Sequence, residues 1–137
     1  MTLFVDTSVL YAVADRTDSG NSAAKAILAS GEDLMTSDHV LVESWRLIQR
    51  RLGHRAADAF WAAIAAGSLE LEIVSRPDLE AAWTIGAAFP DQSFSIVDRT
   101  SFAVMLRLGI HRAASFDKDF AVFRFGSRRE RAFEIVR

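Results

Sequence analysis

The sequence predicts an α/β fold in which helices cover both faces of a mainly parallel sheet. Short apolar segments in which polar residues do not alternate are typical of strands buried on both faces. These segments alternate along the chain with segments of helical periodicity, which favours parallel strands joined by helices. The 137 residues are half hydrophobic, enough for a core and too apolar for a disordered chain. We therefore expect a single domain over residues 1–137, built as a three-layer α/β/α sandwich.

The N-terminal half begins with an apolar strand and contains the helix with the strongest periodicity. In that helix Leu41, Trp45, Ile48 and Leu52 share one face, and Gly53 supplies the stop. The elements expected here are a strand over 2–5, helices over 6–15 and 21–31, a strand over 33–36 and a helix over 37–53.

The C-terminal half continues the alternation. Pro77 stands in the first turn of one expected helix, where proline is tolerated, and Gly109 ends another. The elements expected here are a helix over 54–67, a strand over 69–74, helices over 76–89 and 94–109, and strands over 112–116 and 132–136.

Composition excludes several classes of protein. The chain has no cysteine, which rules out disulfides and thiolate metal sites. Asp6 interrupts the N-terminal apolar run before a signal peptide can form. No apolar run approaches the ~20 residues of a membrane span. We expect a cytoplasmic protein that does not interact with membranes.

The net charge of −2 at first argues against a nucleic-acid partner, but the basic residues are clustered. Fourteen of the 16 are arginine, whose planar fork suits phosphate. The alternative is that these arginines form an ordinary solvated surface. The placement of the charges has to decide between this alternative and a nucleic-acid-binding surface. The two clusters are Arg46, Arg50, Arg51, His54 and Arg55, and Arg124, Arg128, Arg129 and Arg131.

Carboxylates follow two of the predicted strands. Asp6 comes directly after the first strand, and Asp117 follows the segment RAASF, with Asp119 two residues later. In open parallel sheets, sites lie at the carboxyl ends of the strands. Either aspartate alone is explained by a turn or a helix cap, and Asp6 or Thr7 is available as such a cap. The coincidence of two at the same edge favours a site.

Two further carboxylates lie on predicted helices. Glu43 is flanked by apolar residues on its face of the helix, so we expect it half-buried; the alternative is pairing with Arg46 or Arg50. Asp98 forms a capping-box pattern with Ser95, although a carboxylate in a first helical turn can also serve a cation.

A cluster of Asp6, Glu43, Asp98 and Asp117, with Asp119 nearby, is tolerable only if a divalent cation neutralises it. Oxygen-only ligands select Mg²⁺ or Mn²⁺, and such ions promote hydrolysis of phosphodiesters. These residues therefore predict metal-dependent phosphoryl hydrolysis.

Four segments, FVDTSVLYAVAD, SDHVLVESW, FSIVDRTSFAVM and AASFDKDF, resemble the PIN-domain nucleases, and most closely the VapC toxins of toxin–antitoxin modules. The resemblance covers essentially the whole chain and implies a three-layer PIN domain. It implies an acidic quartet that acts in catalysis, a metal site and three supporting residues. The catalytic quartet consists of Asp6, Glu43, Asp98 and Asp117. The metal site consists of Asp6, Asp98, Asp117 and the accessory Asp119. The supporting residues are Thr7, Ser8 and Ser115.

The same resemblance implies an Mg²⁺- or Mn²⁺-dependent endoribonuclease that inhibits translation by cutting the sarcin–ricin loop of ribosomal RNA, or tRNA. FSIVDRTSF is closer to the type that cuts ribosomal RNA. It further implies a homodimer and a cognate antitoxin whose basic side chain reaches the carboxylates.

Within this interpretation, Arg46, Arg50 and Arg99 are candidate phosphate-binding residues beside the acidic cluster. The alternative function is a non-catalytic module with the same fold that binds RNA or protein. The acids argue against it, because a binding module has no use for carboxylates that repel one another.

Overall fold

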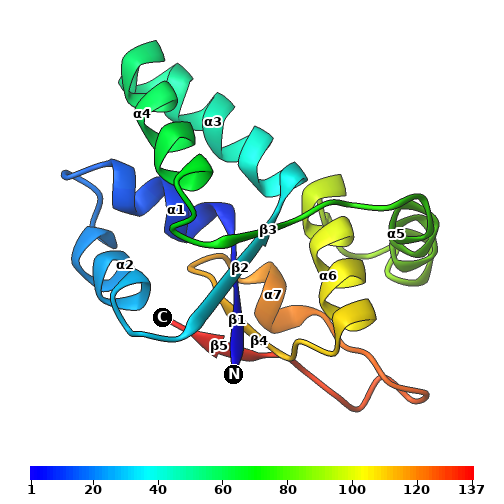
Figure 1. Cartoon of the computed structure of the whole chain (residues 1–137). Coiled ribbons are helices and arrows are strands. Elements are labelled where there is room, and N and C mark those ends of the chain that lie inside the picture. The colour runs from blue at the N-terminus through cyan, green and yellow to red at the C-terminus, as the bar shows by residue number, and fades with distance from the viewer.

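The computed structural model describes residues 1–137 and consists of a five-stranded parallel sheet with helices around it (Figure 1). The strands are β1 (Thr2–Val5), β2 (Asp33–Ser37), β3 (Glu70–Glu72), β4 (Arg112–Ala114) and β5 (Glu134–Val136). The helices are α1 (Thr7–Ala14), α2 (Asn21–Leu28), α3 (Asp38–Leu52), α4 (His54–Ala65), α5 (Arg76–Ala88), α6 (Ile96–Leu108) and α7 (Asp119–Val122). The expected α/β architecture with a parallel sheet is confirmed.

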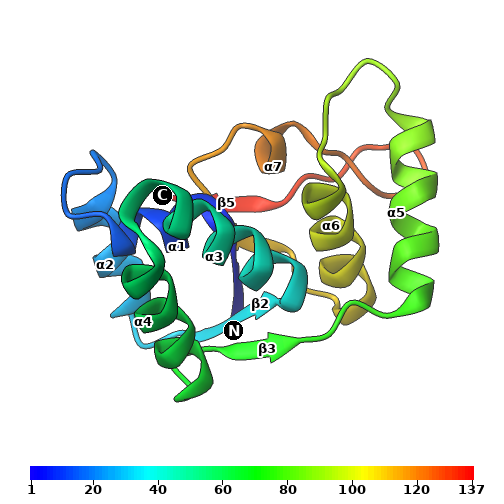
Figure 2. The same cartoon turned by 90° about the horizontal axis from the view of Figure 1, so that it is seen from above.

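The strand order is β3-β2-β1-β4-β5, with β1 in the centre. The chain first adds β2 and β3 on one side of β1 and then returns to add β4 and β5 on the other. Seen from above, α1, α2 and α4 lie on one side of the sheet, and α5 and α6 on the other (Figure 2). The strand order reverses between β1 and β4, which is where a parallel sheet opens a crevice at its carboxyl edge.

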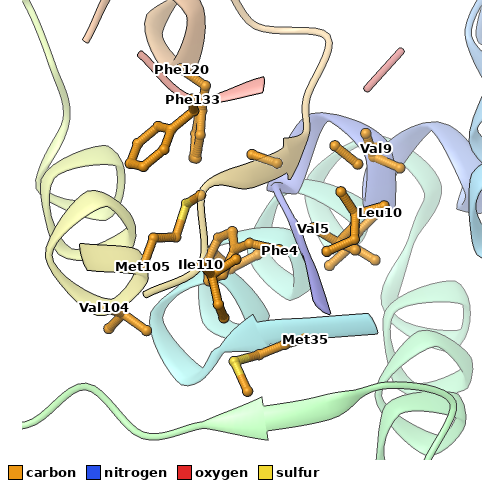
Figure 3. Packing of buried hydrophobic residues seen from close by; sticks show 14 of the residues in the cluster. Phe4, Val5, Val9, Leu10, Met35, Val104, Met105, Ile110, Phe120 and Phe133 are labelled. Atoms are coloured by element: carbon orange, nitrogen blue, oxygen red, sulfur yellow. The ribbon is translucent and has the colours of Figure 1, made fainter. Parts of the chain in front are cut away.

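Strand β1 is covered on both faces, which explains why its sequence does not alternate. Leu3, Phe4 and Val5 are completely buried. Figure 3 shows Val5 directed toward Val9 and Leu10 of α1, whereas neighbouring Phe4 lies among side chains on the opposite face. Each residue of β1 therefore serves one of two hydrophobic layers.

Aromatic packing fixes α6 and the C-terminal segment to the sheet. The ring of Phe102 on α6 stacks on Phe123 with centroids 4.3 Å apart and meets the edge of Phe120 at 4.9 Å. Phe120 in turn stacks on Phe4 of β1. This cluster connects α7 to α6 and β1, so the loop that leads into α7 is held close to the end of β1.

Several element boundaries differ from those predicted. The strand expected over 112–116 ends at Ala114, and Ser115, which follows it, donates its hydroxyl to Asp6. Helix α7 was not predicted: four residues are too few for a periodic pattern, and Phe120 is anchored by packing. On the apolar face expected for α3, Leu41 and Ile48 are buried, but Leu52 at the end of the helix is 38% exposed. None of the helices combines the length and the apolar character that crossing a bilayer requires.

Candidate active site

A polar pocket of about 380 Å³ opens at the carboxyl edge of the sheet, at the switch point between β1 and β4. Five carboxylates and no basic side chain line it. The lining residues are Asp6, Thr7, Ser8, Glu43, Leu47, Ser93, Ser95, Asp98, Asp117 and Asp119. All five carboxylates singled out from the sequence are thus brought together.

Asp6 is held by two serine hydroxyls. Its backbone occupies the N-cap position of α1, but its side chain does not cap the helix. Instead Oδ2 accepts hydrogen bonds from Ser8 and Ser115, both at 2.9 Å. Burial raises the pKa of the Asp6 carboxyl, and the two hydroxyls oppose that rise by stabilising its charged form. The helix-cap alternative for this side chain is therefore wrong.

The loop between β4 and α7 is tied to the end of β1 by the same serines. The backbone N–H of Phe116 donates to Ser8 Oγ at 2.9 Å, and that of Asp117 donates to Ser115 Oγ at 3.1 Å. Asp117 Oδ1 then accepts from the backbone N–H of Asp119 at 3.1 Å. These bonds fix both loop aspartates relative to β1.

Asp98 enters the pocket from the first turn of α6. The capping box is present: Asp98 Oδ2 accepts from the Ser95 N–H at 3.0 Å, and Ser95 Oγ accepts from the Asp98 N–H at 3.0 Å. Oδ1 of Asp98 makes no hydrogen bond within the chain. Burial raises the pKa of Asp98 to about 7, and the negative charges of Asp6 and Asp119 add to the rise. Asp98 is thus both a cap residue and a pocket carboxylate.

Glu43 completes the pocket from the second turn of α3. It is half-buried, as expected, and it forms no ion pair with Arg46 or Arg50. The alternative of a helix-surface ion pair is therefore wrong. Its charge faces the pocket without compensation from the chain.

The donor set fits a hard divalent cation. One carboxylate oxygen each from Asp98, Asp117 and Asp119 lies within 4.8 Å of the others. Oxygen ligands and retained water are what Mg²⁺ and Mn²⁺ prefer. Burial is the main cause of the raised pKa of Asp98, the charges of Asp6 and Asp119 add to it, and a bound cation would favour the charged carboxylate.

A second hollow of about 700 Å³ runs beside α3 and adjoins the acidic pocket. Thr7, Glu43 and Leu47 line both. Arg46 and Arg50 line this groove, so they lie beside the carboxylates as predicted. The complete lining is Thr7, His39, Val42, Glu43, Arg46, Leu47, Arg50 and Val97.

Arg99 is not part of either hollow. Its Nε donates to the backbone carbonyl of Phe94 at 2.9 Å, and its guanidinium lies against Gly86 of α5, where a side chain would clash with it. One residue along a helix turns the side chain by about 100°. Asp98 faces the pocket, and Arg99 consequently faces α5. The position of Arg99 does not support a phosphate-binding role at the pocket.

Sequence reasoning missed several lining residues. Ser93 carries no motif signal, and Ser95 was noted only as a cap. His39 precedes Glu43 by one helical turn, and this spacing could have indicated a shared face.

With this geometry in view, comparison with known proteins defines the class. Residues 3–126 match the family model described as the PIN domain. The chain therefore belongs to the PIN-domain family.

Within that family the similarity is to VapC toxins. The chain is 41% identical over 124 residues to the 23S rRNA-specific endonuclease VapC20 of Mycobacterium tuberculosis, covering 90% of this chain and 95% of that protein. The crystal structure of Mycobacterium tuberculosis VapC20, described as a sarcin–ricin loop cleaving toxin, superimposes with a TM-score of 0.81 at 41% identity, over 85% of this chain and 91% of the other. FitAcB from Neisseria gonorrhoeae shares the fold alone, with a TM-score of 0.64 at 15% identity over 87% of this chain and 89% of the other.

Proposed function

We propose that this protein is a metal-dependent endoribonuclease, the toxin of a toxin–antitoxin pair, and that it cuts the sarcin–ricin loop of large-subunit ribosomal RNA. The observation that carries the proposal is a pocket with five carboxylates and no base, in a chain 41% identical to a 23S rRNA-specific endonuclease. On this proposal the protein acts in the cytoplasm, where ribosomes are found.

Asp98, Asp117 and Asp119, together with Asp6, would hold one or more Mg²⁺ or Mn²⁺ ions. The bound ion supplies an activated water and neutralises charge that develops on the phosphodiester. Asp6 is kept in place for this task by Ser8 and Ser115, and Asp98 by the capping box with Ser95. The rigid attachment of both carboxylates limits the reorganisation that binding requires.

The substrate enters along α3. Arg46 and Arg50 are exposed on the groove that adjoins the pocket and hold backbone phosphates there. Glu43 lies between the pocket and the groove and is the carboxylate nearest to this path. Cleavage requires the RNA strand to pass from the arginines of the groove to the carboxylates of the pocket. The phosphate contacts of these arginines explain how a chain of net charge −2 binds RNA.

An antitoxin fits the same pocket by charge. A basic side chain of a partner protein placed among five uncompensated carboxylates would replace the cation and block substrate. We further propose that the toxin is a homodimer. Co-purification with the product of a short adjacent reading frame, and mass measurement of the free toxin, test these two assignments.

The function is tested by mapping RNA ends after purified ribosomes are incubated with the protein and Mg²⁺. A single new 5′ end in the sarcin–ricin loop is expected, and it should be absent with Asp117→Asn. The matched control is Asp33→Asn, an exposed carboxylate at the start of β2, outside the pocket. Ends in tRNA instead would identify the alternative substrate. RNA binding without any cleavage would support the non-catalytic module and contradict the proposal.

A further inference from the structure

The groove beside α3 contains one polar side chain that is held in place by another element, and this is His39. Its Nδ1 lies 3.2 Å from Oγ1 of Thr100 on α6. Thr7, Glu43, Arg46 and Arg50, which are the other polar residues of the groove, make no side-chain hydrogen bond within the chain. The imidazole therefore presents a defined chemical face to whatever lies in the groove.

The hydrogen bonds of Thr100 determine which ring nitrogen carries the proton. Thr100 Oγ1 lies 2.9 Å from the carbonyl oxygen of Ile96 and 3.2 Å from that of Val97. A hydroxyl has one proton, and here it is donated to these carbonyls in the previous turn. Thr100 Oγ1 is then left to accept from Nδ1–H of His39. In the neutral ring, Nε2 carries the lone pair.

Nε2 is available to a ligand. It has no hydrogen-bond partner within the chain and is not among the buried unpartnered atoms of the molecule, so it is open to solvent. His39 precedes Glu43 by one turn of α3, or about 6 Å along the axis, and both line the groove. The lone pair is therefore offered about one helical turn from the acidic pocket.

An acceptor at this position selects a donor. Phosphate oxygens are acceptors and do not pair with a lone pair, and Arg46 and Arg50 already provide donors for them. Along a nucleic-acid backbone the one group that can donate is the 2′-hydroxyl, and it is also the group that distinguishes RNA from DNA.

We propose that His39 accepts a hydrogen bond from a ribose 2′-hydroxyl close to the scissile phosphate, and that Thr100 positions the imidazole for this contact. His39 is thus a residue that makes the enzyme specific for RNA. The inference rests on the proposed ribonuclease function and adds to it a determinant of sugar recognition.

The test is a binding cycle with a synthetic sarcin–ricin hairpin in EDTA, where no cleavage is expected. Affinity is measured by fluorescence anisotropy for the all-RNA hairpin and for hairpins with a single 2′-deoxynucleotide at each loop position. For the wild type, one deoxy substitution is expected to weaken binding about three- to tenfold, the loss typical of one hydrogen bond. For His39→Phe that penalty should disappear, and the hairpins should bind alike.

Three further variants separate recognition of the 2′-hydroxyl from an effect on folding. His39→Gln retains a terminal acceptor and should keep part of the deoxy penalty. His54→Phe replaces an exposed histidine outside the groove and should keep all of it. Thr100→Val frees the ring and should reduce the penalty without any direct contact with RNA.

Three outcomes would contradict the inference. One is that no single deoxy substitution weakens binding to the wild type, and another is that His39→Phe keeps the full penalty. The third is that His39 contacts a base amino group instead of a 2′-hydroxyl. In that case inosine in place of guanosine would weaken binding to the wild type but not to His39→Phe. In all three, cleavage of the hairpin with Mg²⁺ would leave the ribonuclease function intact. If the wild type neither binds nor cuts the hairpin with Mg²⁺, the function itself is wrong.

Discussion

Replacing Asp98 by asparagine should stabilise the metal-free protein at high pH while abolishing its response to Mg²⁺. Asp98 is 8% exposed and shares the pocket with four other carboxylates. Asparagine removes the charge but keeps an oxygen that can accept from the Ser95 N–H, so the capping box survives. The substitution therefore isolates the cost of the negative charge.

The magnitude follows from the pKa of Asp98, which burial raises from 3.8 to about 7. Between these values the folded protein holds a proton that the unfolded chain has lost. The free energy of unfolding consequently falls as pH rises through this window and levels off above it. From pH 5 to pH 8 the loss is on the order of 3 kcal/mol. Asp98→Asn avoids this loss, so the difference in free energy of unfolding between the variant and the wild type should increase by that amount, in favour of the variant, from pH 5 to pH 8.

The assay is urea unfolding in EDTA at pH 5 to 8, followed by fluorescence of the three tryptophans. Asp33→Asn, at the amino end of β2, is the control, and its difference in stability from the wild type should not increase with pH in this way. Added Mg²⁺ should stabilise the wild type at pH 8 and leave Asp98→Asn unchanged. A difference in the free energy of unfolding that is the same at all pH values, or equal stabilisation of both proteins by Mg²⁺, would refute the assigned cost of the Asp98 charge.

Three other substitutions test separate parts of the account. Arg50→Glu should weaken binding of the hairpin and lower the slope of log affinity against log salt by roughly one, measured by salt titration; an unchanged slope would exclude a phosphate contact. Ser115→Ala removes a hydrogen bond that lowers the pKa of Asp6, so the acid limb of the cleavage pH profile should move to higher pH. Arg107→Ala leaves buried Asp78 unpaired and should cost about 2 kcal/mol in thermal unfolding, less than for a fully buried pair because Arg107 is one-third exposed.

Much of the fold and of the acidic pocket follows from the sequence. A parallel sheet brings the ends of neighbouring strands together, so the sequence predicts that Asp6 and Asp117 lie close to each other, and both line the pocket. The side chain of Glu43 was expected half-buried because apolar residues flank it, and it is. The capping pattern of Ser95 and Asp98 correctly predicted the start of α6.

Other features depend on contacts between distant segments and leave no local signal. Arg99 adjoins Asp98 in the sequence, but the helix turns it toward α5, and only the packing of α5 on α6 shows this. Helix α7 exists because Phe120 packs on Phe102 and Phe4. The hydrogen bond from His39 to Thr100 joins residues 61 positions apart.

The central claim is that the acidic pocket cuts RNA with the help of a divalent cation. Its most direct test compares wild type and Asp6→Asn in cleavage of the sarcin–ricin hairpin, each with Mg²⁺ and with EDTA. Asp6 suits the test because asparagine fits the same space and can still accept from Ser8 and Ser115. Cleavage by the wild type with Mg²⁺ alone, and by Asp6→Asn in neither condition, is the predicted result. Equal cleavage by the two proteins, or cleavage by the wild type in EDTA, would contradict the account.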